Sequence, residues 1–258
     1  MDLLSETCSQ SPVRDFPHSV FELIDESNKL EEEKYAWYSV ETWYPVQIGE
    51  VFQNQYQAIT KIGYGTANHR YVALKVYLVN PRAVQPKPNV CLVYEPMGMS
   101  LSEMATHSYD DNGIPVDVVK GITMYLLAAL DFLHSKANLV HTDLQSGNVM
   151  FSIESETSLQ DIVEDELNHP SPRKIHNDGH IIFKSRQILT SDIQYPTICD
   201  FGEARFGKDE YVEHAMPDMY RAPEILLHLP WSNKIDIWAL GLMASSPVLY
   251  PFQMRISS

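Results

Sequence analysis

One stretch decides the fold of this chain: His141-Thr142-Asp143-Leu144-Gln145-Ser146-Gly147-Asn148. A second motif, Asp200-Phe201-Gly202, follows further along the chain. An Asp followed five residues later by an Asn, on a short loop after a predicted helix, supplies one base and one metal ligand facing the same point. A second Asp on a later turn completes a pocket for Mg²⁺ and phosphate. An Asp–Asn pair can also be a simple Asx cap, but the order of the two motifs favours a site for phosphoryl transfer.

These two motifs resemble the catalytic loop and metal-binding turn of protein kinases, H-R-D-L-x-x-x-N and D-F-G. The stretch Ala222-Pro223-Glu224 follows in the order that the resemblance requires. The resemblance implies that Asp143 orients the substrate hydroxyl and accepts its proton, and that Asn148 and Asp200 bind Mg²⁺. It also implies that Lys75, in the β-rich stretch 72–76, places a cation on the phosphates of ATP.

Three further stretches are similar to the SR-protein kinases, especially their short fungal relatives: Y-P-V-x-I-G-E-V-F (44–52), K-I-G-Y-G (61–65) and C-L-V-Y-E-P-M-G-M-S (91–100). The resemblance covers about residues 44–243. It implies an ATP-dependent kinase that phosphorylates serines in basic, Arg/Ser-rich proteins, with a role in RNA splicing. The residues that it places on the nucleotide are Ile62, Gly63, Gly65, Ala73, Lys75, Tyr94 and Glu95.

The implied fold is α+β and bilobal, with a reduced N-terminal β-lobe and an incomplete helical C-lobe. We expect a disordered acidic arm over 1–34, the reduced N-lobe over 35–95, the partial C-lobe over 96–246 and an irregular tail over 247–258. The N-lobe is reduced because residues 66–72 are too few for the strand that usually follows the glycine loop. In addition, residues 77–93 contain no acidic side chain to pair with Lys75 and carry three prolines, which break helices.

Within the C-lobe, residues 116–136 are predicted to form a helix whose core face has helical spacing: Val119, Ile122, Leu126, Ala129, Leu130 and Leu133. His134 at its end is interpreted as structural. Residues 234–241 begin a second, central helix, from which Asp236 is expected to brace the backbone of the catalytic loop. Residues 151–195 form a polar insert, interpreted as a solvated loop in preference to a docking element. Because later helices are missing, apolar faces of both predicted helices are expected to be exposed.

The composition limits the classes of partner that this chain is expected to bind. The 258 residues carry a net charge of −15, which argues against unspecific binding to nucleic acid or an anionic membrane and favours a basic partner. Three isolated cysteines fit a reducing compartment, and no signal peptide is apparent. From the composition we expect an intracellular protein with no membrane contact. The family resemblance implies a monomer of the cytoplasm and nucleus that uses ATP and Mg²⁺.

Two readings compete with an active protein kinase. The first is a catalytically inactive kinase or a truncated fragment that acts as a binding protein, because the partner of Lys75 and part of the helical lobe are missing. The second is a small-molecule phosphotransferase, against which stretches 222–224 and 236–238 argue.

Thr142 stands where the kinase loop has Arg, and no Ser or Thr lies between Asp200 and Glu224. Between Asp200 and Glu224 only Tyr211 and Tyr220 could be phosphorylated. We therefore expect that the protein does not need phosphorylation of this segment for activation.

Overall fold

The computed structural model describes residues 13–34, 46–52, 56–61, 73–76, 91–107, 114–153, 155–186, 195–207 and 210–245. The chain divides into two compact units. Unit 1 is drawn from Met1–Pro96 and Ser155–Ile188, and unit 2 from Met97–Glu154 and Leu189–Ser258. Helices and strands both occur, which confirms the predicted α+β class.

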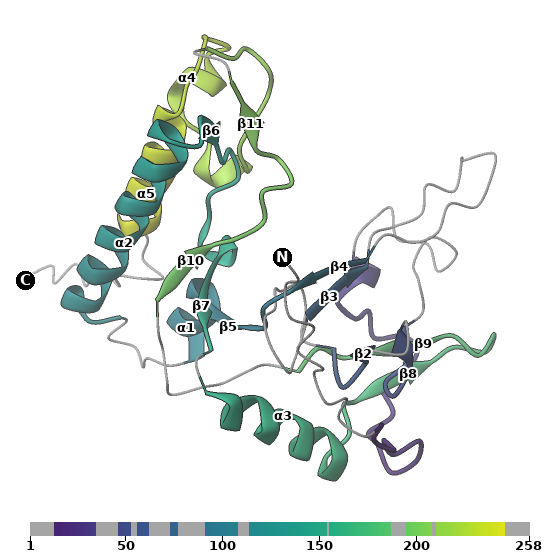
Figure 1. Cartoon of the computed structure of the whole chain (residues 1–258). Helices are drawn as coiled ribbons and strands as arrows, with labels where there is room; N and C mark the ends of the chain where they lie inside the picture. The colour runs from purple at the N-terminus through teal and green to yellow at the C-terminus, as the bar shows by residue number, and fades with distance from the viewer. Residues whose placement is uncertain are drawn as a thin grey trace, which may run out of the picture. The chain divides into compact units, whose positions relative to one another are not determined.

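Unit 2 is built on two helices that lie side by side, α2 (Val116–Ser135) and α5 (Lys234–Ser245), as Figure 1 shows. The helix predicted over 116–136 is thus confirmed. Its predicted core face is confirmed as well: Ile122, Leu126 and Leu130 are buried, and Val119, Ala129 and Leu133 pack against the same cluster. Apolar residues three and four apart share one face of a helix, so burial of that face holds α2 in place.

Short elements complete unit 2 and carry its loops. The strands β5 (Met97–Ser100), β7 (Val149–Ser152) and β10 (Pro196–Ile198) form an antiparallel sheet in the order β10-β7-β5. A second antiparallel pair joins β6 (Leu139–Val140) to β11 (Arg205–Phe206). The short helices are α1 (Leu101–His107), η3 (Ser146–Asn148), η4 (Asp218–Tyr220) and α4 (Pro223–Leu226).

The helix α1 begins at a capping box. The Ser100 hydroxyl accepts a hydrogen bond from the Glu103 backbone N–H at 3.2 Å, and the Glu103 carboxylate accepts one from the Ser100 N–H at 2.7 Å. This reciprocal pair satisfies two N–H groups that a helix start otherwise leaves open. It therefore fixes where α1 leaves strand β5.

Both long helices of unit 2 also expose apolar side chains. The exposed fractions are 67% for Met124 and 60% for Phe132 on α2, and 45% for Ile237 and 42% for Trp238 on α5. The expectation that both helices have exposed apolar faces is confirmed. Within the described segments, no helix is both long and apolar enough to cross a bilayer.

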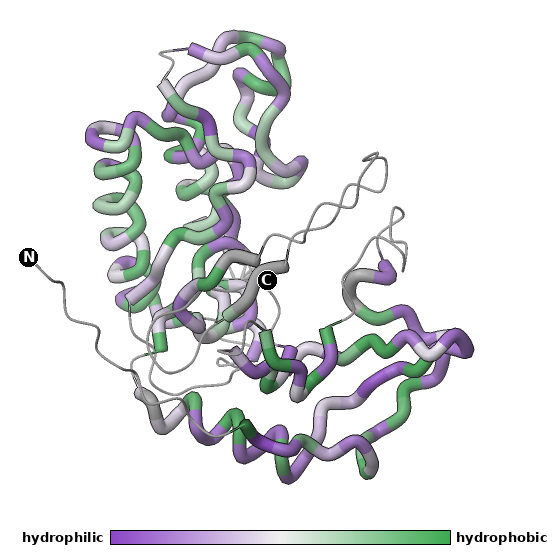
Figure 2. Tube along the Cα trace, turned by 45° about the vertical axis from the view of Figure 1, so that its right-hand side comes forward, coloured by the Kyte–Doolittle hydropathy of each residue, from purple (hydrophilic) through white to green (hydrophobic). Residues whose placement is uncertain are grey.

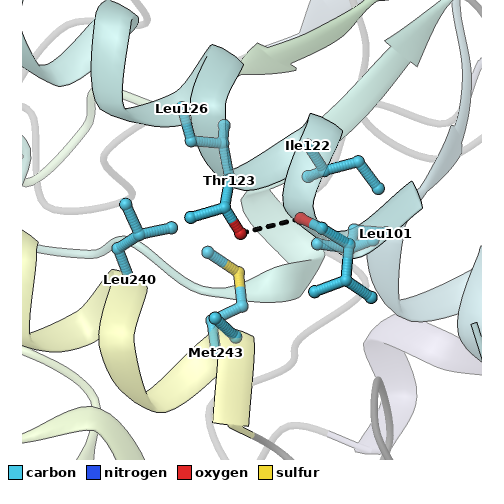
Figure 3. Close-up of a pocket in the computed structure, with 8 residues that line it drawn as sticks. Leu101, Ile122, Thr123, Leu126, Leu240 and Met243 are labelled. Atoms are coloured by element: carbon cyan, nitrogen blue, oxygen red, sulfur yellow. Dashed lines mark hydrogen bonds between the residues drawn. The ribbon is translucent and has the colours of Figure 1, made fainter. Parts of the chain in front are cut away.

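A small pocket lies between α1, α2 and α5. Figure 3 shows Leu101, Ile122, Leu126, Leu240 and Met243 around it, and all lining residues except Thr123 are apolar. The Thr123 hydroxyl donates to the Val119 carbonyl of its own helix at 2.8 Å and is not offered to a ligand. The pocket is therefore a gap in core packing and not a candidate for substrate binding.

Unit 1 consists of short strand pairs and one helix. The pairs are β1 (Val51–Phe52) with β2 (Tyr56–Gln57), β3 (Ala73–Val76) with β4 (Cys91–Tyr94), and β8 (Arg173–Ile175) with β9 (Ile181–Phe183), all antiparallel. The helices are η1 (Glu31–Lys34) and α3 (Glu156–Asn168). Residues 62–72 and 77–90, for which a shortened glycine loop and a missing helix are predicted, lie outside the described residues.

The insert over 151–195 differs from the solvated loop that was predicted. It contains α3 and the β8–β9 hairpin, and residues 155–188 belong to unit 1, whereas the prediction assigned them to the C-lobe. In Figure 2, hydrophilic and hydrophobic residues follow one another along the turns of α3. Its buried Val163 packs in one cluster with Phe16, Ile48 and Phe183. Burial of this apolar face is the physical reason why the acidic insert forms a helix.

The N-terminal arm also differs from the prediction, because its described part, residues 13–34, packs onto the insert. The Ile24 N–H donates to the Arg173 carbonyl at 3.0 Å, and the Arg173 N–H donates to the Glu22 carbonyl at 3.1 Å. The Arg173 guanidinium lies 4.1 Å from the centre of the Phe21 ring, a cation–π contact. These contacts order a stretch whose composition alone suggests disorder.

Two buried charges strengthen this packing. Lys174, only 1% exposed, donates to both carboxylate oxygens of Glu33, at 2.9 and 2.7 Å, and to the Glu26 carbonyl at 3.1 Å. Glu166, also 1% exposed, accepts from Thr60 at 3.0 Å and from the Nε and Nη2 atoms of Arg186 at 3.0 and 2.7 Å. Burial raises the pKa of the Glu33 carboxyl, but hydrogen bonds from Lys174 and Leu30 and the charges of Lys174 and His176 outweigh it, so the pKa lies below its usual value.

Candidate active site

The loop that carries Asp143 and Asn148 is held between two strands of unit 2. Strand β6 ends at Val140, directly before the loop, and β7 begins at Val149, directly after η3. Val149 lies opposite Ile198 of β10, and the Cys199 N–H donates to the Asn148 carbonyl at 2.8 Å. This pairing places the end of the loop beside the turn that contains Asp200.

Asp236 on α5 braces the loop backbone, as predicted. Its side chain is buried, and its two oxygens accept the N–H groups of His141 at 2.8 Å and Thr142 at 2.9 Å. A third bond joins Asp236 to the Nε2 atom of His134 at 2.8 Å, which confirms that His134 is structural. Thr142 is held with φ at 67°, a backbone conformation that is strained for a β-branched residue. The bonds to Asp236 therefore impose a conformation that Thr142 would not adopt by itself.

The Asp143 carboxylate is held by two side-chain amides. The Asn148 Nδ2 atom donates to Asp143 Oδ2 at 2.9 Å and to the Asp143 carbonyl at 2.8 Å. The Gln145 Nε2 atom donates to Asp143 Oδ1 at 3.0 Å. The sequence predicted Asp143 and Asn148, and the structure brings them together.

The pKa of the Asp143 carboxyl is shifted upward from its ordinary value. Burial is the main cause, and the neighbouring charge of Asp200 acts in the same direction, while the hydrogen bonds from Asn148 and Gln145 oppose the shift. A carboxylate whose pKa is raised is a better proton acceptor than a free aspartate. The arrangement therefore suits Asp143 to accept the proton of a hydroxyl.

The second turn follows strand β10 directly. Asp200 has φ at 61°, and its Oδ1 atom accepts the Gly202 N–H at 3.3 Å. The carbonyl of Cys199 lies 3.0 Å from the His141 Nε2 atom, and the Phe201 ring meets the His141 ring edge-on at 4.9 Å. The turn and the catalytic loop therefore pack as one assembly. Burial raises the pKa of the Cys199 thiol to about 11, so it stays protonated at neutral pH and is a poor nucleophile.

The donor set of this assembly fits Mg²⁺. Since the Asn148 Nδ2 atom is used by Asp143, the amide oxygen is the Asn148 atom that could bind a cation. With the Asp200 carboxylate it gives two oxygen ligands, and Mg²⁺ typically takes one or two such ligands and completes its coordination with phosphates and water. In the described part of the chain, no group of three or more His, Cys, Asp or Glu side chains is placed to hold a metal.

The residues predicted to bind the nucleotide belong to unit 1, whereas Asp143, Asn148 and Asp200 belong to unit 2. Pairing of β3 with β4 sets Ala73 opposite Tyr94 and Lys75 opposite Leu92. Ala73 is buried, and the exposed Glu95 follows Tyr94 directly. The three other predicted residues, Ile62, Gly63 and Gly65, lie outside the described residues.

Two contacts of the site were not predicted from the sequence. One is the bond from Gln145 to Asp143. The other runs from the Thr142 hydroxyl to the Glu203 carbonyl at 2.8 Å, and so ties the catalytic loop to the residue after the second turn. Thr142 was noted only as a missing arginine, because a sequence gives the residue type and not its rotamer. Tyr211, one of the two tyrosines considered for modification, is buried and stacks on Trp231.

Comparisons with known proteins identify relatives of this chain. The family model of the protein kinase domain matches residues 173–252. Serine/threonine protein kinases of two Aspergillus fumigatus strains are each 34% identical over 281 residues, which cover 90% of this chain and 67% of the relative. The serine/threonine-protein kinase SRPK of Physarum polycephalum is 25% identical over 270 residues, 78% of this chain and 62% of the relative.

The chain spans about two thirds of the length of these relatives. Among solved structures, the crystal structure of a kinase domain matches with a TM-score of 0.43 and 27% identity, over 69% of this chain and 46% of the other. The catalytic loop, the second turn and the extensive similarity to the fungal kinases lead to one conclusion: this chain belongs to the protein serine/threonine kinases.

Proposed function

We propose that this chain transfers the terminal phosphoryl group of ATP to serine side chains of basic, Arg/Ser-rich proteins. The observation that carries the proposal is the Asp143 carboxylate, held by Asn148 and Gln145 on a loop that Asp236 braces. Asp143 would orient the serine hydroxyl and take its proton while the hydroxyl oxygen bonds to the terminal phosphorus and ADP leaves. Asn148 and Asp200 would hold Mg²⁺, which supplies positive charge to the phosphates.

The choice of a basic substrate is supported by charge. Glu210, Glu213 and Asp218 are on the segment after the second turn, and the whole chain has a net charge of −15. Acidic groups near a peptide-binding segment favour basic partners and disfavour acidic ones. A relative named SRPK, at 25% identity, supports the same substrate class. From the family resemblance we also propose a monomer of the cytoplasm and nucleus that takes part in RNA splicing.

The second candidate is an inactive kinase that binds protein partners. The exposed Ile237 and Trp238 on α5 favour it, because large exposed apolar residues often mark contact surfaces. It predicts binding without phosphoryl transfer.

The test begins with a thermal melt of the whole chain with and without Mg²⁺–ATP, beside the variant Asp200→Ala. At a hundredfold excess over Kd the ligand should stabilise the wild type by about 2.7 kcal/mol and the variant less. Phosphorylation is then followed on an Arg/Ser-repeat peptide, an Arg/Ala-repeat peptide and a Ser-containing acidic peptide. Transfer to the first peptide alone supports the proposal. Binding of Mg²⁺–ATP without transfer supports the inactive candidate, and a melt that no ligand shifts refutes an ATP-dependent activity for this chain.

A further inference from the structure

Position 145 of the catalytic loop carries a neutral amide that contacts the proposed base. The Gln145 Nε2 atom lies 3.0 Å from Asp143 Oδ1, and the Asn148 Nδ2 atom lies 2.9 Å from Asp143 Oδ2. Each oxygen of the carboxylate therefore accepts one hydrogen bond from a different amide.

This arrangement restrains the plane of the carboxylate. The terminal torsion of an aspartate is broad, so a single hydrogen bond leaves the group free to turn about the bonded oxygen. Bonds to both oxygens remove that freedom. Asn148 is itself fixed, because its Nδ2 atom also donates to the Asp143 carbonyl and its own carbonyl accepts the Cys199 N–H. Gln145 supplies the second point of attachment.

The position of the base decides how well a reaction of this kind proceeds. Phosphoryl transfer depends mainly on positioning and charge stabilisation, and a displacement of about 1 Å can reduce the rate by about 100-fold. A residue that fixes the plane of Asp143 would therefore affect turnover without contacting the reacting atoms.

Resting on the proposed function, we propose that Gln145 is a positioning residue, whose side-chain amide holds Asp143 Oδ1 and sets the plane of the carboxylate for the incoming hydroxyl. The competing role is a direct contact with the phosphates of ATP. The two roles predict different kinetics. Loss of positioning lowers kcat and leaves the affinity for ATP unchanged, whereas loss of a phosphate contact raises KM and Kd for ATP.

The experiment compares three variants of the full chain. Gln145→Met removes the donor at nearly constant volume, Gln145→Lys keeps an N–H donor, and Lys120→Met is a control on the exposed surface of α2. We measure kcat and KM on the Arg/Ser peptide, and Kd for Mg²⁺–ATP by calorimetry. Gln145→Met should lower kcat by about 10- to 100-fold with KM and Kd for ATP within about twofold of wild type. Gln145→Lys should restore most of kcat, and the control should match wild type.

Crystal structures of the wild type and Gln145→Met supply a readout that does not depend on activity. The carboxylate plane of Asp143 should be turned in the variant. An unchanged plane, an unchanged kcat, or a raised Kd for ATP with an unchanged kcat each overturns the positioning role. If the wild type transfers no phosphoryl group, the proposed function has failed, and the carboxylate plane still decides whether Gln145 holds Asp143.

Discussion

The sharpest consequence of the site concerns the substitution Asp236→Asn. The Asp236 carboxylate is fully buried and accepts three hydrogen bonds, from the N–H groups of His141 and Thr142 and from His134 Nε2. An asparagine of the same shape offers one acceptor oxygen, and its NH₂ group would face a donor at the other position.

The cost follows from these bonds. Hydrogen bonds to a charged group contribute roughly 1.5–3 kcal/mol each, and a buried donor left unsatisfied costs about 1–3 kcal/mol. An amide nitrogen in place of Oδ1 removes the acceptor of the Thr142 N–H, and one in place of Oδ2 removes the shared acceptor of the His141 N–H and His134. In either orientation Asp236→Asn leaves at least one buried donor unsatisfied. We therefore expect the free energy of unfolding of unit 2 to fall by roughly 3–5 kcal/mol. Asp117→Asn, an isosteric change at a side chain that is 93% exposed on α2, should change it by less than about 1 kcal/mol.

Urea unfolding followed by circular dichroism measures the stability, and hydrogen exchange of a peptide spanning residues 136–150 locates the effect. Exchange at His141 and Thr142 should speed up in Asp236→Asn and remain at the wild-type rate in Asp117→Asn. Equal urea midpoints for the two variants, or loop amides that stay protected in Asp236→Asn, would refute the role given to this carboxylate.

Further predictions concern the packing of each unit. Lys174→Met leaves the Glu33 carboxylate without its buried partner and should destabilise the chain by about 3–5 kcal/mol in urea unfolding, whereas Lys120→Met, at an exposed pair, should cost less than about 1 kcal/mol. Because the pKa of Glu33 is lowered by folding, its contribution is present above its unfolded pKa, near 4.5, and is lost as the pH falls through the folded value. A pH series of melts should show a steeper loss of stability below about pH 4.5 in wild type than in Glu33→Gln. Leu130→Ala removes a fully buried side chain and should cost about 2–5 kcal/mol, while Leu227→Ala, at a 66% exposed position, should cost under about 0.5 kcal/mol; stability indifferent to the first substitution would contradict the assigned core.

The sequence was informative where short-range spacing decides the structure. The core face of α2 repeats at three and four residues, so its burial could be predicted, and Asp143, Asn148 and Asp200 stand in motifs whose spacing defines their chemistry. The role of Asp236 was predictable only through the family resemblance. Its partners lie 94 and 95 residues away, and composition does not indicate such a pairing.

The insert and the arm were misjudged for a related reason. The helix α3 is acidic, and its apolar face carries few residues, of which Val163 is fully buried. Its partners Phe16 and Ile48 lie more than 100 residues earlier in the chain, and Phe16 belongs to an arm whose composition suggests disorder. Each segment is too weakly apolar to fold alone, and only their mutual burial, with the ion pairs of Lys174 and Glu166, stabilises both. A reading that treats segments separately cannot detect this mutual stabilisation.

The link between His141 and Asp236 has a further consequence, for the time at which the site forms during synthesis. The two residues are 95 positions apart, and α5 ends only at Ser245. A ribosome that adds about 5–20 residues per second needs several seconds to pass from one to the other. During that interval the nascent chain already contains Asp143 and Asn148, but the loop lacks the carboxylate that imposes its strained backbone. The loop that carries Asp143 and Asn148 can therefore take its braced form only after α5 has emerged and docked.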